Sequence, residues 1–330
     1  MTTTLPIHGG TDDGPPIKHD FSTNANPLGP PPALMQAIRE ADRRGYPDPD
    51  YRALRQSLGN DHEVESERIL PAAGGSEAIR RLTLAAHLQG LRQVWVPQPG
   101  FGDYAQAALA LGMEIRRYAN AAELRANEAP ALIWVCEPRN PSGSSLGATA
   151  LLDLPGRVAN GSLIVIDRAC EPLRLQGDPT PLPAGCWELH CPNKALGLTG
   201  VRAAYLLAPA FEESRIRTLL SLAPSWVLST EGQVLLMHWH EAETQHWISD
   251  SREQLRQWTT QQRALLSGLG WRQLDSSTHF WLAKPPGPLP DLRAQGIKLR
   301  DATSFGLPGW VRIAALAPES QQALSRALQA

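Results

Sequence analysis

The chain has 330 residues, of which 42% are apolar and 19% are charged, and its formal net charge is −2. This length suits two packed domains, and the composition suits a soluble globular protein with a large core. The near-neutral charge without a basic block excludes a dedicated nucleic-acid binder, and no apolar run is long enough to span a membrane.

Four cysteines occur at irregular spacings without a CxxC pair: Cys136, Cys170, Cys186 and Cys191. A chain of this size does not need disulfides to fold. Residues 1–16 are polar and lack the apolar segment of a secretory signal. We therefore expect a reduced, cytoplasmic protein.

The predicted elements begin with an extended arm, because the run Pro27–Pro32 is too rigid for a helix or a central strand. A helix follows at about residues 33–44. Nearly continuous apolar runs at 94–96, 131–135 and 163–166 suit strands buried on both faces, and helical segments such as 77–88 separate them. This alternation predicts an α/β fold with a mostly parallel, doubly wound sheet.

Three parts are predicted along the chain. Residues 1–44 form an N-terminal arm and helix that pack with the small domain, and residues 45–215 form the large domain. Residues 216–330 form a smaller α+β domain, with a strand pair near residues 278–283 and 310–314.

Asp167 and Lys194 are the candidate catalytic residues. Asp167 ends a predicted buried strand, and an acid at the carboxyl end of a parallel strand points into the ligand crevice. The competing interpretation of Asp167 is a helix cap. Lys194 is followed by Gly197 and Gly200, which let the backbone approach a ligand, and by Arg202, which suits a phosphate. A lysine alone is more often a solvated surface charge.

The candidate ligand contacts lie at the start of a predicted helix and after other predicted strands. Backbone amides at the start of a helix and the hydroxyl of Ser76 form an anion site, although glycine-rich turns are also ordinary helix starts. Phe101 or Tyr104 can stack on a planar ring, or both can be core aromatics. Asn140 lies in a turn and can donate to a ring hydroxyl. These cofactor contacts are Gly75, Ser76, Glu77, Phe101 and Asn140.

Taken in order, these motifs resemble fold-type I pyridoxal-phosphate (PLP) enzymes of the class I/II aminotransferase superfamily. The segment 137–143 resembles the family signature Asn-Pro-x-x-Pro-Ser/Thr-Gly, and Asn193-Lys194 with Arg202 resembles its Ser-Lys…Gly-x-Arg signature. The resemblance implies pyridoxal 5'-phosphate bound as a Schiff base on Lys194, with Asp167 beside the pyridine nitrogen. It also implies a homodimer in which Tyr46 reaches the cofactor phosphate of the neighbouring subunit.

The N-terminal segments His8-Gly9-Gly10 and Asp20–Gly29 resemble L-threonine-O-3-phosphate decarboxylases of cobalamin (vitamin B12) biosynthesis. That resemblance implies a carbon–carbon lyase that decarboxylates L-threonine O-3-phosphate to (R)-1-amino-2-propanol phosphate. It also implies a set of substrate contacts, namely His8, Gly9, Asn24, Asn140, Arg300 and Arg312. Two arginine forks suit a substrate that carries a carboxylate and a phosphate.

Two alternatives remain open: a histidinol-phosphate-type aminotransferase, and a non-catalytic PLP-binding paralogue. The chain departs from the family at Arg168 and Cys170, where an acid and an aromatic residue are usual, and at Asn193, where serine is usual. His238, His240 and His246 fall in a helix-like stretch without an acidic or cysteine ligand to complete a set, so no metal is expected.

Overall fold

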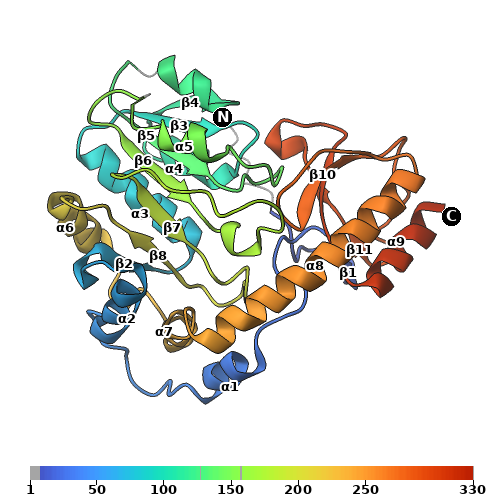
Figure 1. Ribbon diagram of the computed structural model, residues 1–330, viewed down its shortest axis with the longest axis horizontal. Helices are drawn as coiled ribbons and strands as arrows, with labels where there is room; N and C mark the ends of the chain where they lie inside the picture. Colours follow the sequence, from blue (N-terminus) through green and yellow to red (C-terminus); the bar gives the residue numbers. More distant parts are fainter. Residues whose placement is uncertain (1–7, 127, 157, 330) are drawn as a thin grey trace.

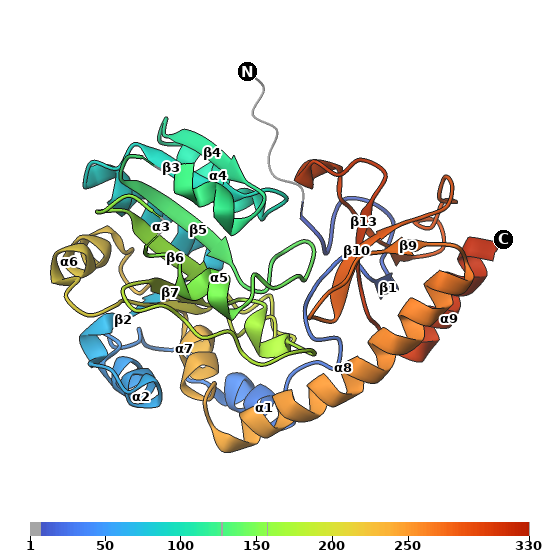
Figure 2. The ribbon, with the colours of Figure 1, turned by 45° about the horizontal axis from the view of Figure 1, so that its top comes forward.

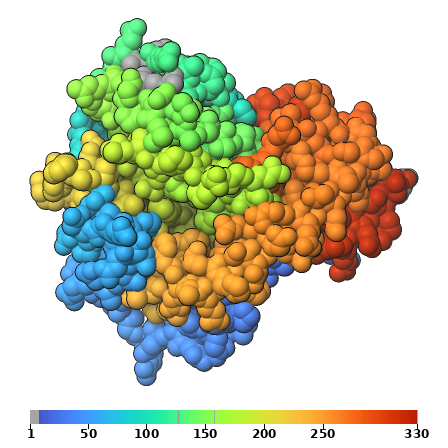
Figure 3. Space-filling model, in the orientation of Figure 1, coloured from blue at the N-terminus to red at the C-terminus, as the bar shows by residue number. Residues whose placement is uncertain are grey.

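The structure is a computed structural model that describes residues 8–126, 128–156 and 158–329. Figure 1 shows a large α/β body built on one sheet and a smaller body of strands and helices, with the long helix α8 (Ala242–Gly268) running from one to the other. In Figure 3 the surfaces of the two bodies meet. This arrangement confirms the predicted α/β fold with a large, mostly parallel sheet.

The large sheet has the strand order β2-β8-β7-β6-β5-β3-β4. Only β8 runs antiparallel to its neighbours β2 and β7, and the remaining pairs are parallel. Every residue of β5 and β6 is buried, as expected for strands covered on both faces. The strands are β2 (Ile69–Ala72), β3 (Gln93–Pro97), β4 (Glu114–Tyr118), β5 (Ala131–Cys136), β6 (Leu163–Asp167), β7 (Trp187–His190) and β8 (Ala204–Leu207).

Helices cover both faces of this sheet. One core contains apolar side chains of α3 (Gly75–Leu88), α4 (Gly102–Leu109) and α6 (Glu213–Leu222) packed on the strands. The opposite face packs against the remaining helices of the large body and the first half of α8. Those helices are α1 (Pro32–Glu40), α2 (Arg52–His62), α5 (Ala148–Leu152) and α7 (Thr230–Met237), with short 3-10 turns η1 (Ser66–Arg68), η2 (Ala121–Ala126) and η3 (Glu171–Leu173). The domain division at residue 215 stays a prediction.

The smaller body holds an antiparallel sheet of order β12-β13-β10-β9. Its core packs against the end of α8 and against the C-terminal helix α9 (Pro318–Gln329). The N-terminal arm joins this body, because β1 (His19–Asp20) pairs in parallel with β11 (Ile297–Lys298). Figure 2 shows the arm running along the smaller body before it reaches α1. The other elements are β9 (Arg272–Gln273), β10 (Phe280–Lys284), β12 (Arg300–Asp301), β13 (Val311–Ala314) and η4 (Thr303–Phe305).

Two predicted helices end differently in the structure. The helix expected at about 33–44 stops at Glu40, because the guanidinium of Arg43 donates to carbonyl oxygens at its C-terminal end, those of Ile38 (2.6 Å), Arg39 (3.1 Å) and Ala41 (3.1 Å). The stretch with three histidines is broken between α7 and α8, so His238 and His240 lie in the connection and only His246 is helical.

Within residues 8–126, 128–156 and 158–329, no helix is long and apolar enough to cross a membrane. Over the same ranges, no group of three or more histidine, cysteine or acidic residues is arranged to hold a metal ion.

Candidate active site

A cleft of about 1930 Å³ opens where the carboxyl ends of the parallel strands face the small sheet and the N-terminal arm. Its lining joins residues that are far apart in the sequence, as expected at the carboxyl edge of a doubly wound sheet. Among the predicted site residues it brings together His8, Gly9, Asn24, Gly75, Ser76, Phe101, Asn140, Asp167, Asn193, Lys194, Arg202, Arg300 and Arg312. Glu77 and Tyr46 do not line this cleft.

Lys194 lies in the loop between β7 and β8. The arm holds this loop in place, because the backbone N–H of Asn26 donates to the Lys194 carbonyl oxygen at 2.8 Å. The lysine nitrogen Nζ lies 6.0 Å from the centre of the Phe101 ring. Burial alone would lower the pKa of the Lys194 ammonium, but the neighbouring Cys170 and Asp167 outweigh burial and raise that pKa above its usual value.

Asp167 is the last residue of β6, and its carboxylate is held at both oxygens. The hydroxyl of Tyr104 donates to Oδ2 at 2.6 Å, and the backbone N–H of Ala169 donates to Oδ1 at 2.9 Å. Tyr104 is fully buried and stacks on Trp134 with ring centroids 4.9 Å apart. Tyr104 therefore positions Asp167, a role that the sequence did not reveal. Of the two aromatic residues, Phe101 is the one whose ring lies near the Lys194 amine.

The start of α3 meets Arg202 at the edge of the cleft. Gly74 has φ +87° there, and a Cβ atom at this position would collide with the Arg202 guanidinium. A Cβ atom on Gly75 would lie 2.8 Å from the sulfur of Cys191. The close approach of the Arg202 guanidinium to Gly74 places the arginine directly beside the backbone amides of a helix N-terminus, an arrangement that suits a phosphate.

Two other predicted residues at this end, Ser76 and Glu77, make contacts within the protein. The Ser76 hydroxyl donates to the carboxylate of Asp103, which was not predicted as a site residue. The side chain of Glu77 turns away, because it pairs with Arg81 (3.0 Å) and accepts from the backbone N–H of Ala73 (3.1 Å). The side chain of Glu77 is thus a helix-start contact, and no sequence signal distinguished it from a ligand.

Two buried arginines face the cleft from paired positions on β12 and β13. Arg300 and Arg312 are register partners, and both guanidiniums are buried. The Arg312 fork donates to Oδ1 of Asn140 at 2.7 Å and to the carbonyl oxygen of Ser22. Burial and the neighbouring charge of Arg300 lower the pKa of Arg312 to about 10. Two like charges in a buried place favour an anionic ligand between them.

The N-terminal arm forms one wall of the cleft. The imidazole of His8 lies 3.6 Å from Asp103 and its ring centre is 5.8 Å from that of Phe101. The Asn24 amide donates to the sulfur of Cys170 at 3.9 Å. The buried Cys170 thus occupies the place where the resemblance leads one to expect an aromatic side chain.

Tyr46 lies outside the cleft, in the connection between α1 and α2. Its side chain is 79% exposed and stacks on Trp226, with ring centroids 4.1 Å apart. The predicted reach of Tyr46 into a neighbouring subunit stays a prediction.

The residues around Lys194 fit pyridoxal 5'-phosphate. An amine for the aldehyde, a fixed carboxylate for the pyridine nitrogen, an aromatic ring near the amine and a glycine-lined anion pocket all face one cleft. Fold and cleft together define a PLP-dependent enzyme.

The chain belongs to the family described as "Aminotransferase class I and II", whose family model matches residues 16–330. Among curated proteins, histidinol-phosphate aminotransferase of Halorubrum lacusprofundi is 29% identical over 312 residues, covering 89% of this chain and 83% of that protein. The corresponding enzyme of Symbiobacterium thermophilum is 27% identical over 344 residues, covering 94% of this chain and 91% of that protein.

Two solved structures share the fold at lower identity. L-threonine-O-3-phosphate decarboxylase from Porphyromonas gingivalis has a TM-score of 0.78 at 22% identity, covering 94% of this chain and 98% of that chain. Histidinol-phosphate aminotransferase from Sinorhizobium meliloti in complex with pyridoxal-5'-phosphate has a TM-score of 0.79 at 20% identity, covering 95% of this chain and 90% of that chain.

Proposed function

We propose that this PLP-dependent enzyme decarboxylates L-threonine O-3-phosphate to (R)-1-amino-2-propanol phosphate, a step of cobalamin biosynthesis. The observation that carries the proposal is the pair of buried, neighbouring guanidiniums of Arg300 and Arg312 in a cleft that the His8 arm also lines. A substrate with a carboxylate and a phosphate supplies two anions to such a pair.

Each side chain has a defined task in this proposal. Lys194 binds the cofactor aldehyde through Nζ. When bound, the cofactor supplies an electron sink for the bond that breaks at the substrate α-carbon. Asp167 would keep a proton on the pyridine nitrogen, and the Lys194 amine would return a proton to the α-carbon. Arg312 and Arg300 orient the substrate anions, and this orientation selects the bond to be broken.

Transamination of histidinol phosphate is the second candidate function. The curated relatives compared above carry that name at 27–29% identity, and the same lysine, aspartate and arginines would serve the reaction. Loss of carbon dioxide and transfer of an amino group differ in the geometry at the α-carbon, which the residue types alone do not fix.

The experiment that separates the two candidates uses the PLP-loaded protein with each substrate in turn. L-Threonine O-3-phosphate should release carbon dioxide and leave the cofactor in its aldehyde form. If instead L-histidinol phosphate converts the cofactor to its pyridoxamine form, and 2-oxoglutarate restores it, the decarboxylase proposal is wrong. A protein that binds PLP but turns over neither substrate would support the non-catalytic alternative.

Arg312→Lys tests the anion contacts themselves. Lysine keeps the charge but loses the fork that holds Asn140 and the Ser22 carbonyl. We expect KM for the phosphorylated substrate to rise by at least about tenfold when the variant is assayed saturated with PLP. An unchanged KM would remove Arg312 from the substrate contacts.

A further inference from the structure

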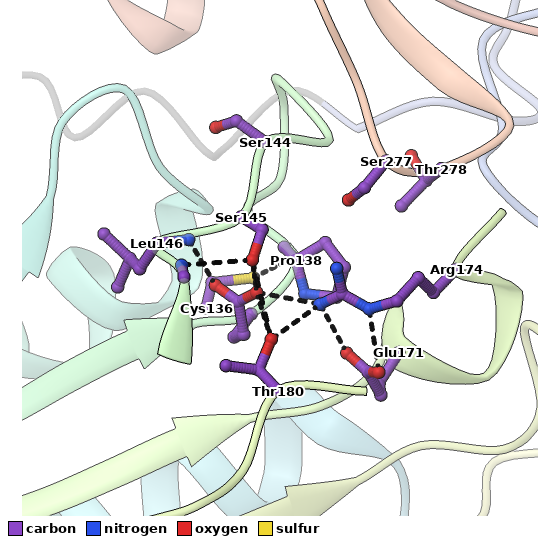
Figure 4. A network of polar contacts seen from close by, with 12 residues as sticks. Cys136, Pro138, Ser144, Ser145, Leu146, Glu171, Arg174, Thr180, Ser277 and Thr278 are labelled. Carbon is purple, nitrogen blue, oxygen red and sulfur yellow. Dashed lines mark hydrogen bonds and ion pairs between the residues drawn. The ribbon is translucent and has the colours of Figure 1, made fainter. Parts of the chain in front are cut away.

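A cluster of three buried charges lies behind the loop that carries Asn140. Glu137, Arg174 and Glu171 are 2%, 6% and 8% exposed, respectively. Glu137 follows β5, and Glu171 begins η3, four residues after the end of β6. None of the three lines the cleft. Figure 4 shows the guanidinium of Arg174 beside Glu171 and Thr180.

The contacts of Arg174 are close and directional. Its Nε and Nη2 donate to the two oxygens of Glu171, each at 2.9 Å, which is a bidentate pair. Nη2 also donates to Oε1 of Glu137 at 2.8 Å and to the Thr180 hydroxyl at 3.0 Å. A guanidinium can serve both acids because its donors point along a fixed fork.

The carboxylate of Glu137 is held on its other sides as well. Oε1 accepts from the hydroxyls of Thr180 (3.0 Å) and Ser145, and Oε2 accepts from the backbone N–H of Leu146 at 2.9 Å. Glu137 is the first residue of the segment 137–143 that resembles the family signature. The acid found here carries a charge that requires a buried partner, and Arg174 supplies that partner.

The same cluster joins three segments around the cleft. Arg174 forms a β-bridge with Thr278, next to β10 of the small body. Ser277 in turn accepts from the backbone N–H of Leu175 at 2.6 Å and donates its own N–H to the Gly143 carbonyl at 2.8 Å. Gly143 belongs to the turn that begins with Asn140, whose amide oxygen accepts from Arg312.

We propose that Glu137, Arg174 and Glu171 are positioning residues that fix the Asn140 turn and the segment after Asp167 for cofactor binding. The proposal rests on the cofactor contact proposed for Asn140. Arg174 acts through these two segments and has no contact with the cofactor. Loss of its charge leaves two buried carboxylates without a counter-charge, and their repulsion spreads the two segments apart.

The test measures PLP affinity by titration of the visible absorption band at one pH, together with the urea unfolding midpoint of the cofactor-free protein. Arg174→Met should weaken PLP binding by at least about tenfold. Glu137→Gln in the Arg174→Met background removes one of the unpaired acids and should recover much of the affinity.

Two further variants keep the test decisive. Arg256→Met removes a half-exposed arginine whose Nε donates to the Leu175 carbonyl at 2.9 Å, so it perturbs the same segment outside the cluster and should leave PLP affinity unchanged. If Arg174→Met does not fold, Arg174→Lys keeps the charge without the fork and should give an intermediate loss of affinity.

The proposal is overturned if Arg174→Met, or Arg174→Lys in its place, binds PLP as tightly as the unaltered protein. It is also overturned if Glu137→Gln fails to restore any affinity in the Arg174→Met background. A loss of affinity that is equal in Arg256→Met would show general destabilisation instead of positioning. Because PLP binding is measured directly, these outcomes do not depend on which substrate the enzyme uses, and failure of the decarboxylase proposal leaves them interpretable.

Discussion

Replacing Tyr104 by phenylalanine isolates one hydrogen bond of the cleft. The Tyr104 hydroxyl donates to the buried carboxylate of Asp167 at 2.6 Å. Burial raises the pKa of Tyr104 well above its usual value, and the Asp167 charge raises it further, so the phenol stays a donor at all working pH values. Phenylalanine keeps the ring that stacks on Trp134, so no large cavity forms.

The size of the effect follows from the charge of the acceptor. A hydrogen bond to a charged group contributes about 1.5–3 kcal/mol to stability, against about 0.5–1.5 kcal/mol for a neutral pair. Tyr118 is the matched control, because it is equally buried and its hydroxyl donates at 2.6 Å to the neutral carbonyl oxygen of Trp134. Tyr104→Phe should therefore lower the free energy of unfolding by about 1 kcal/mol more than Tyr118→Phe.

Urea unfolding of the cofactor-free variants at one protein concentration measures this difference in stability. PLP titration of the same variants measures the effect on cofactor binding. Tyr104→Phe should also weaken PLP binding, since Asp167 then keeps only the contact from the Ala169 N–H, whereas Tyr118→Phe should bind PLP normally. If the two variants unfold at the same urea concentration and bind PLP equally, Tyr104 does not position Asp167.

Three other predictions address separate parts of the chain. Burial lowers the pKa of His279 from 6.5 to about 4, so the unfolded chain binds more protons than the folded chain between these pH values. The free energy of unfolding should therefore fall by up to about 1.4 kcal/mol per pH unit as the pH drops through this window. In urea titrations, the free energy of unfolding of His279→Gln should depend less steeply on pH than that of the unaltered protein. Gly143 has φ +71° and no room for a Cβ atom beside Ser276, whereas Gly147 has φ +82° in open space; the melting temperature should fall more for Gly143→Ala than for Gly147→Ala. Tyr46→Ala should weaken PLP retention without changing the far-ultraviolet circular dichroism spectrum, and retention equal to that of the unaltered protein would argue against its proposed reach into a second subunit.

The sequence predicted those parts of the fold that depend on local patterns. The apolar run ending at Asp167 identified a buried strand and the acid at its carboxyl end, because burial on both faces leaves a continuous signal. The glycines around Arg202 and Ser76 identified the anion end of the cleft in the same way. The roles of these residues can be predicted from the few residues on either side of them in the sequence.

Other features depended on partners far along the chain. Phe101 and Tyr104 are equivalent as sequence, and only the position of Trp134 decides which ring stacks in the core. Glu77 was predicted as a cofactor contact because it begins a helix, but Arg81 draws its side chain away. Glu137 pairs with Arg174, which is separated from it by 37 residues. Such pairings require the folded chain.

The short parallel pairing of β1 with β11 has a mechanical consequence. It fastens the start of the chain to the smaller body, and Lys298 in β11 adds a hydrogen bond to the Gly10 carbonyl and an ion pair to Asp12 at 2.6 Å. Any rigid rotation of the smaller body toward the large sheet therefore carries the histidine at position 8 and the arginines of β12 and β13 together. The N-terminal arm and the sheet of the smaller body, which both line the cleft, would therefore move together as one rigid unit.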